Sequence, residues 1–356
     1  MIETAPTRPA VAAPADLLLE VKDLRVQFPL DDGVVRAVDG VSFELRRGKT
    51  LGIVGESGCG KSVTAQAVLR ITPKPGRVVG GEMLYHRRRD DGSTETVDLA
   101  KLDPFGAEVR RIRGKEIAYI QQEPMAALSP VHTVGHVIGE RLRLHLGVGK
   151  DEARQRTVDI LTRVGMPRPG QMVDRYPHQM SGGQRQRAVI AMALCCRPSL
   201  LIADEPTTAL DVTTEAQILE LMTDLQRDFQ MSMQFITHNL GVVAELADEV
   251  CVMYLGKQVE RAPVEELFFN PKHPYTKALL RSVPQLGKKT QARLESIKGM
   301  VPDPYNIPPG CAFHPRCPYY KPGICDDPEF RQVGDNHWVR CSRAEELHLA
   351  AIEPAR

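Results

Sequence analysis

The stretch GESGCGKS, residues 55–62, places three glycines ahead of a lysine and a serine. Glycine adopts backbone angles that other residues avoid, so successive N–H groups of such a stretch can curl around an anion. Lys61 can then reach the outer phosphates of a nucleotide, and Ser62 can offer its hydroxyl to Mg²⁺. The stretch therefore predicts a phosphate-binding loop.

The sequence around this loop has the order of elements that a phosphate-binding loop requires. An apolar strand, TLGIV at 50–54, runs directly into the loop, and KSVTAQAVLRI at 61–71 follows with helical spacing of its apolar residues. The positive end of that helix would point at the bound phosphates. We therefore expect a nucleoside triphosphate site between a strand and a helix.

An acidic pair ends a second apolar strand, SLLIADEP at 199–206. Asp204 can order the coordination shell of Mg²⁺, and Glu205 is placed to act as the general base for an attacking water. The alternative is that the two acids only cap the helix that follows. The glycine loop earlier in the chain favours the catalytic interpretation.

The bulk composition is that of a globular protein with no strongly charged surface. The 356 residues are 42% hydrophobic and 26% charged, with a net charge of +1, so we expect no nucleic-acid partner. No stretch approaches the roughly 18 apolar residues of a membrane span, and the start of the chain lacks the pattern of a secretion signal. The interpretation is a cytosolic protein that reaches a membrane by docking to another chain, with a disordered tail over 1–16.

Strands and helices alternate along most of the chain, which predicts an α/β core with a parallel sheet over residues 17–265. An antiparallel β subdomain opens it, and a helical insert occupies about 123–198. After about residue 265 the content of proline, histidine, tyrosine and cysteine rises and the periodicity fades. Residues 266–356 are therefore expected to form a separate C-terminal extension.

The stretch MSGGQRQR, residues 180–187, resembles the signature of ABC-type ATPases, with Met180 in place of the usual leucine. Ser181 and two glycines at the start of a helix would form a second anion cradle. The resemblance implies a P-loop NTPase fold with a RecA-like core. It also implies that two ATPase domains face each other head to tail, each ATP lying between the glycine loop of one and the signature of the other.

The resemblance covers about residues 17–265 and assigns further roles. Phe28 would stack on adenine, although a core phenylalanine on an edge strand is the alternative. Gln122, next to Gln121, matches the glutamine that touches Mg²⁺ or the water, and Asp211 matches a loop at the dimer interface. His238 matches the histidine that contacts the γ-phosphate.

Three sets of site residues follow from the loop, the acids and the resemblance. The expected ATP-binding residues are Phe28, Gly55, Glu56, Ser57, Gly58, Cys59, Gly60, Lys61, Ser62, Val63, Gln122, Ser181, Gly182, Gly183, Gln184, Asp204 and Asp211. The expected Mg²⁺ ligands are Ser62, Gln122 and Asp204. The expected catalytic residues are Glu205, His238, Lys61 and Gln122.

The tail resembles the C-terminal region of ATPase subunits of oligopeptide/dipeptide importers, a family that includes nickel importers. The similarity lies in FFNPKHPYTKALLRSVP at 268–284 and IKGMVPDPYNIPPGCAFHPRCP at 297–318. It implies an ATPase subunit that drives uptake of di- or oligopeptides, with nickel or another small solute as the alternative cargo. A soluble ABC ATPase of DNA repair or translation is disfavoured by the single set of motifs and the balanced charge.

Four of the eight cysteines crowd into the tail, and in a reducing cytosol such a cluster is more often a metal site than a disulfide framework. They are Cys311, Cys317, Cys325 and Cys341. The importer family associates these cysteines with a [4Fe–4S] cluster, and the absence of a close C-x₂-C pair is atypical of zinc. Zinc and metal-free thiols remain the alternatives, as do a structural and a regulatory role.

The family resemblance also implies partners. They are a second ABC ATPase subunit, expected to be a related but different chain, and two transmembrane permease subunits. An extracytoplasmic peptide-binding protein would act indirectly. The expected location is the cytoplasmic face of the inner membrane.

Overall fold

The computed structural model describes residues 16–349 except 90, 123–126, 209 and 283–296. The tail expected at 1–16 thus lies outside the described residues apart from Asp16. Within the part of the chain that is described, no helix is long and apolar enough to cross a membrane.

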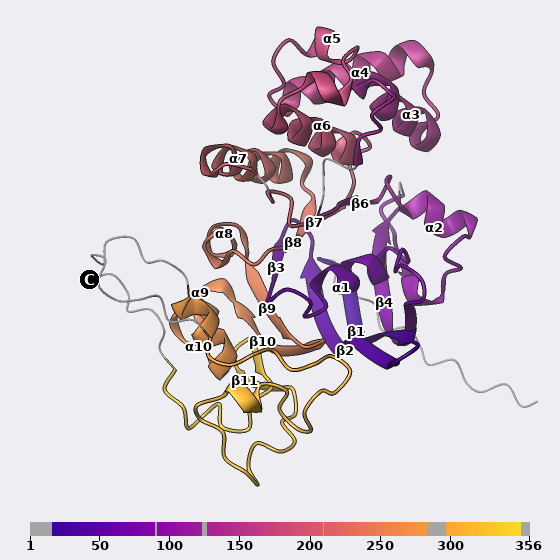
Figure 1. Ribbon diagram of the computed structural model, residues 1–356. Helices are drawn as coiled ribbons and strands as arrows, with labels where there is room; N and C mark the ends of the chain where they lie inside the picture. The colour runs from indigo at the N-terminus through magenta and orange to yellow at the C-terminus, as the bar shows by residue number, and fades with distance from the viewer. Residues whose placement is uncertain (1–15, 90, 123–126, 209, 283–296, 350–356) are drawn as a thin grey trace, which may run out of the picture.

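A four-stranded antiparallel sheet forms one side of the molecule, in the order β2-β1-β4-β5 (Figure 1). Its first two strands form a long hairpin, as alternating apolar and polar residues predict, because one face is buried and the other is solvated. The strands are β1 (Leu17–Leu30), β2 (Gly33–Arg46), β4 (Arg77–Arg88) and β5 (Thr94–Asp98).

An eight-stranded sheet forms the core, in the order β11-β12-β10-β9-β3-β8-β7-β6. Its centre is parallel, and every residue of β3, β7 and β8 is buried, as expected for strands covered on both faces. The strands are β3 (Thr50–Val54), β6 (Ile117–Ile120), β7 (Leu200–Asp204), β8 (Ser232–Ile236), β9 (Glu249–Tyr254), β10 (Lys257–Pro263), β11 (Arg331–Gly334) and β12 (His337–Val339).

Helices pack against the sheets and also form a separate layer at the top of Figure 1. Those beside the sheets are α1 (Lys61–Val68), α2 (Ala107–Ile112), α7 (Val212–Phe229) and α8 (Leu240–Leu246). The upper layer is α3 (Val134–Leu146), α4 (Lys150–Arg163), α5 (Pro169–Met172) and α6 (Gly182–Leu194), within the expected helical insert. Its core continues into the sheet through one hydrophobic cluster.

The C-terminal segment packs directly on the core sheet. After α9 (Val264–Phe269) and α10 (Pro274–Arg281), the chain returns so that β12 pairs with β10. Glu260 in β10 is fully buried. Its carboxylate accepts hydrogen bonds from the Lys272 and His273 backbone N–H groups (2.6 and 2.9 Å) and from His337 Nε2 (2.8 Å). The expected extension therefore shares a sheet with the ATPase-like part, while the domain limits drawn from sequence stay predictions.

Candidate nucleotide site

The predicted phosphate loop connects β3 to α1, as its strand–loop–helix order requires. Two of its glycines have no room for a side chain. A Cβ on Gly55 (φ +153°) would lie 2.2 Å from the Met253 carbonyl oxygen, and one on Gly60 (φ +101°) would lie 2.1 Å from the Ala37 carbonyl oxygen. The loop thus lies tightly between the end of β9 and β2, which only glycine permits.

Lys61 is buried, and its ammonium group bonds the backbone of the loop that precedes it. Nζ donates to the carbonyl oxygens of Gly55 (2.8 Å) and Glu56 (3.1 Å). A buried ammonium is costly unless hydrogen-bonded, so the loop carbonyls stabilise the charge inside the curve of the loop. The charge is therefore held where phosphate oxygens would enter.

Asp204 is the last residue of β7 and lies beside Ser62. Together the two residues form a candidate Mg²⁺ site. Ser62 Oγ donates to Asp204 Oδ1 (3.0 Å), and Tyr119 Oη donates to Asp204 Oδ2 (2.9 Å). Burial raises the pKa of Asp204 above its usual range, whereas the bonds from Ser62 and Tyr119 oppose that rise. A carboxylate and a hydroxyl at this separation are the kind of oxygen ligands that Mg²⁺ prefers.

Three of the four predicted catalytic residues lie together, with Gln122 and His238 on either side of the Glu205 carboxylate. Gln122 Nε2 lies 3.5 Å from Glu205 Oε2, and His238 Nδ1 lies 3.3 Å from Glu205 Oε1. Thr208 Oγ1 donates to the same carboxylate (3.2 Å). Glu205 has a positive φ of 46°, a backbone conformation uncommon for such a residue and often found at functional sites. The structure thus brings together three side chains that are far apart in the sequence.

The signature forms the exposed start of α6. Ser181 Oγ accepts from the Gln184 N–H (3.3 Å), and Gln184 Oε1 accepts from the Ser181 N–H (3.1 Å), which makes a capping box. Asp211 caps α7 nearby by accepting from the Thr214 N–H (3.0 Å). A Cβ on Gly183 would lie 3.2 Å from the Thr214 side chain, so the two helix starts are neighbours.

Figure 1 shows α6 well separated from α1, the helix that follows the phosphate loop. The signature of this chain therefore does not line its own phosphate loop. Ser181 and Gly182 are exposed, and so is Asp211. This arrangement is compatible with a site completed by a second subunit.

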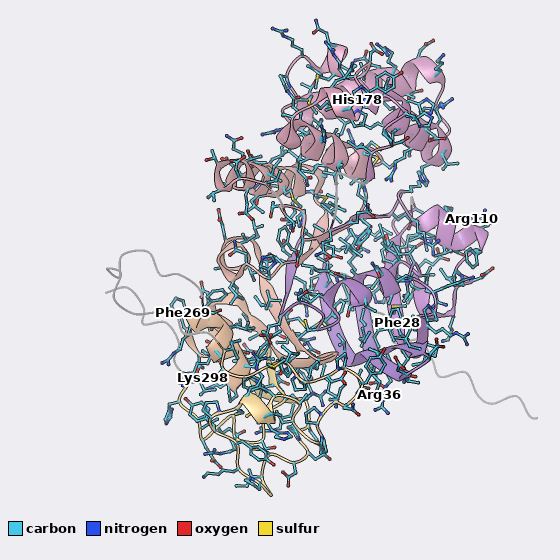
Figure 2. All side chains as sticks on the ribbon, viewed as in Figure 1. Phe28, Arg36, Arg110, His178, Phe269 and Lys298 are labelled. Carbon is cyan, nitrogen blue, oxygen red and sulfur yellow. The ribbon has the colours of Figure 1, made fainter. Side chains whose placement is uncertain are left out.

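Phe28 lies near the end of β1 in the antiparallel sheet (Figure 2). Its ring is half-buried and packs beside Gly76, where an added Cβ would come within 2.6 Å of the ring. The ring also contacts the hydrophobic cluster beneath the sheet. The predicted stacking on adenine stays a prediction.

The four tail cysteines line one small cavity together with His273 and Phe313. Burial raises the pKa of the Cys311, Cys317 and Cys341 thiols, to about 11 for Cys317 and to about 12 for Cys341, and charge repulsion from neighbouring cysteines adds to the rise. The cavity has room for about one water, at about 20 Å³. In the described part of the chain, no three His, Cys, Asp or Glu side chains converge closely enough to hold a metal ion.

His273 adds an unpaired polar group to the lining of this cavity. Burial lowers its pKa to about 3, so the ring is neutral. Nδ1 accepts from the Tyr275 N–H (3.1 Å), which leaves the proton on Nε2, and Nε2 has no hydrogen-bond partner. His314 also lines the cavity, with its Nδ1 bonded to the Cys311 carbonyl, whereas His337 bonds Glu260.

Two segments of the chain match known family descriptions. Residues 38–208 match the family described as ABC transporter, and residues 259–325 match the C-terminal region of oligopeptide/dipeptide transporters. The dipeptide transport ATP-binding protein DppD of Bacillus subtilis is 48% identical over 340 residues, covering 94% of this chain and 98% of that protein. The oligopeptide transport ATP-binding protein OppD of the same organism is 49% identical over 325 residues, covering 91% and 88%.

The chain belongs to the ATP-binding subunits of oligopeptide/dipeptide ABC importers. A solved dimer of the ATP-binding cassette MJ0796, with ADP and Pi bound, has the same fold. Its TM-score is 0.59 at 23% identity, and the match covers 69% of this chain and 99% of that one. This similarity confirms the predicted fold class, and the ABC transporter family match together with the DppD relative confirms the identification as an ABC-type ATPase.

Sequence reasoning missed several residues that contact the site. Tyr119 holds Asp204, and Gln186 Nε2 donates to the Pro206 carbonyl (2.5 Å), which ties α6 to the segment after Glu205. Tyr275 and Arg316 reach the phosphate loop from the C-terminal segment. The position of Tyr119 near the end of β6 could have been suspected, because strand ends supply site residues, but the other contacts join distant parts of the sequence.

Proposed function

We propose that this chain hydrolyses ATP to drive the uptake of di- or oligopeptides by a membrane importer. The observation that carries the proposal is the convergence of Gln122 and His238 on Glu205, beside the Asp204–Ser62 pair. The relatives named for dipeptide and oligopeptide transport support the cargo. The family to which the chain belongs supports the coupling to transport.

The chemistry assigned to this chain is proton transfer and charge stabilisation. Glu205 accepts a proton from the attacking water while His238 and Gln122 orient that water and the γ-phosphate. Lys61 and the loop N–H groups stabilise the charge on the transferring phosphoryl group. Mg²⁺, when bound by Ser62 and Asp204, neutralises charge on the phosphate oxygens.

The proposed assembly contains two ATPase subunits and two permease subunits at the cytoplasmic face of the inner membrane. The exposed signature at Ser181 and the cap at Asp211 would complete the ATP site of the second ATPase subunit. We infer that this second subunit is a related but different chain. A peptide-binding protein outside the membrane would select the cargo.

Uptake measurements with site variants test the function and the cargo together. Cells or proteoliposomes carrying the complete importer are given a labelled dipeptide, a labelled pentapeptide and nickel ions in separate assays. With Lys61→Ala, uptake of at least one peptide should fall to background, whereas Lys150→Ala, an exposed lysine in the helical layer, should leave it unchanged. Loss of nickel uptake with normal peptide uptake would assign the other cargo and contradict the proposal.

We also propose that the four-cysteine cavity holds a [4Fe–4S] cluster. Cys311, Cys317, Cys325 and Cys341 line one cavity and would bind iron as four thiolates, and the His273 Nε2–H would donate to a cluster sulfur. The cavity would have to open as the thiolates spread around the cluster. The ATPase chemistry does not pass through this group.

Analysis of anaerobically purified protein decides the identity of this group. About four iron and four sulfide per chain, with broad visible absorption that bleaches in air, are expected. The Cys325→Ser variant should lose most of the iron, whereas Cys195→Ser, outside the cavity, should keep it. One zinc per chain without colour would establish the zinc alternative, and metal-free protein would establish free thiols.

A further inference from the structure

Glu56, the second residue of the phosphate loop, is held by the C-terminal segment. Arg316 Nη1 lies 2.7 Å from Glu56 Oε2, and Arg316 Nη2 lies 3.0 Å from Glu56 Oε1. The two residues are 260 positions apart in the sequence. Such a two-point contact between a guanidinium and a carboxylate fixes orientation as well as charge.

The Arg316 side chain is rigidly placed before it meets Glu56. It is only 3% exposed, and its guanidinium lies over the rings of Tyr254 and Phe313. Its Nε donates to the Lys298 carbonyl (3.2 Å), and Nη1 also donates to Tyr254 Oη (3.3 Å). Figure 2 places Lys298 in the C-terminal segment, below the core sheet. The Arg316 guanidinium that contacts the phosphate loop is therefore held in place by its other contacts.

The backbone of Glu56 is held from the same side. The Glu56 N–H donates to Tyr275 Oη (2.9 Å), and Tyr275 is fully buried in α10. Its ring packs against Tyr254 and Phe313, with centroids 4.7 and 5.3 Å apart. One aromatic cluster thus supports both the side chain and the backbone of Glu56.

These contacts bear on ATP because Glu56 lies in the loop that would enclose the phosphates. An unneutralised carboxylate in that loop would repel the triphosphate, and the repulsion is strong where water is scarce. The Glu56 carbonyl also accepts from Lys61 Nζ (3.1 Å), so a shift of Glu56 would move the ammonium that faces the phosphates. Both effects lower the affinity for ATP without touching the water-activating carboxylate.

We propose that Arg316 and Tyr275 are positioning residues of the ATPase site: they neutralise Glu56 and hold the phosphate loop in its ATP-binding shape. The C-terminal segment is thus part of the nucleotide site of this chain. The inference rests on the phosphate loop binding ATP, as proposed above. A wild-type importer that fails to hydrolyse ATP would refute that function, whereas the variants below test only the positioning role.

The test compares KM for ATP with kcat in the complete importer. Arg316→Ala should raise KM about tenfold, less than the loss of a fully buried charge pair because the Glu56 side chain is 27% exposed, with kcat changed less than about twofold. Glu56→Gln added to Arg316→Ala should restore most of the affinity, because the unneutralised charge is gone. Arg331→Ala, which removes an exposed ion pair to Glu345 in the same segment, should leave KM unchanged.

Two conservative variants keep the test decisive if Arg316→Ala does not fold. Arg316→Lys keeps the charge but loses the two-point geometry, and Tyr275→Phe removes only the acceptor for the Glu56 N–H. Each should raise KM for ATP about threefold, equivalent to one weak hydrogen bond. Wild-type KM in both, or a double variant no better than Arg316→Ala, would overturn the positioning role. A loss confined to kcat would overturn it as well.

Discussion

At the scale of single residues, the hydroxyl of Tyr119 is one of two that hydrogen-bond the Asp204 carboxylate. Its hydrogen bond favours the carboxylate, so Tyr119→Phe should raise the pKa of Asp204 further above its usual range. Asp204 is proposed to bind Mg²⁺ as the carboxylate. The acid limb of the ATPase pH profile should therefore move to higher pH.

Rates measured between about pH 5 and pH 8 at fixed free Mg²⁺ check this shift. Tyr85→Phe is the matched control, because it also deletes a buried tyrosine hydroxyl, one that bonds Ser199 Oγ (2.7 Å). An acid limb that stays at the wild-type pH for Tyr119→Phe would contradict the proposed effect of Tyr119 on the pKa of Asp204. A shift of equal size in the control would do the same.

Glu205 is the residue on which hydrolysis depends in this account. Glu205→Gln keeps the size of the side chain but cannot accept the proton, so kcat should fall by about a hundredfold or more. Binding of ATP, measured by filter retention or fluorescence, should survive. Glu245→Gln, on the exposed face of α8, should leave both unchanged. A Glu205→Gln protein that still turns over ATP at more than a tenth of the wild-type rate would contradict the role.

At the scale of elements, Glu260 anchors the C-terminal segment to β10. Its buried carboxylate accepts three hydrogen bonds, and Glu260→Ala would leave the three donors without this acceptor. Removing one partner from such a buried network costs about 3–5 kcal/mol. Denaturant unfolding should show that loss, whereas Glu265→Ala, at an exposed position of α9, should lie within about 0.5 kcal/mol of wild type. A Glu260→Ala protein as stable as the control would refute the anchor.

Local periodicity predicted many elements well. The alternation at 17–30 coincides with β1, and the apolar run before the acids coincides with β7. The helix expected over 61–71 ends at Val68, because Arg70 turns to a positive φ of 55° and leaves Ile71 exposed. Apolar spacing alone does not reveal such a stop.

Contacts between distant segments could not be predicted from the sequence. The pairing of β12 with β10 and the ion pair of Arg316 with Glu56 depend on how the tail returns to the sheet. A single sequence carries no period or spacing that links such positions. The convergence of Gln122 and His238 on Glu205 was anticipated only through the resemblance to a family, since each lies in its own local motif.

At the scale of the whole molecule, the account requires a second ATPase subunit. The signature on α6 and the phosphate loop before α1 are separate in one chain, so one copy offers two half-sites (Figure 1). ATP held between two subunits would join them, and hydrolysis would release them. Ser181 and Asp211 are exposed, and the proposed closure would bury them.

Sedimentation of the ATPase pair tests this most directly. The Glu205→Gln form, purified with the second ATPase subunit of its importer, should sediment as a closed pair in saturating MgATP and as separate chains without nucleotide. A Ser181→Arg variant, which would block one of the two shared ATP sites, should form much less of the closed pair in MgATP. A Glu205→Gln protein that remains monomeric in MgATP, while binding the nucleotide, would contradict the shared site.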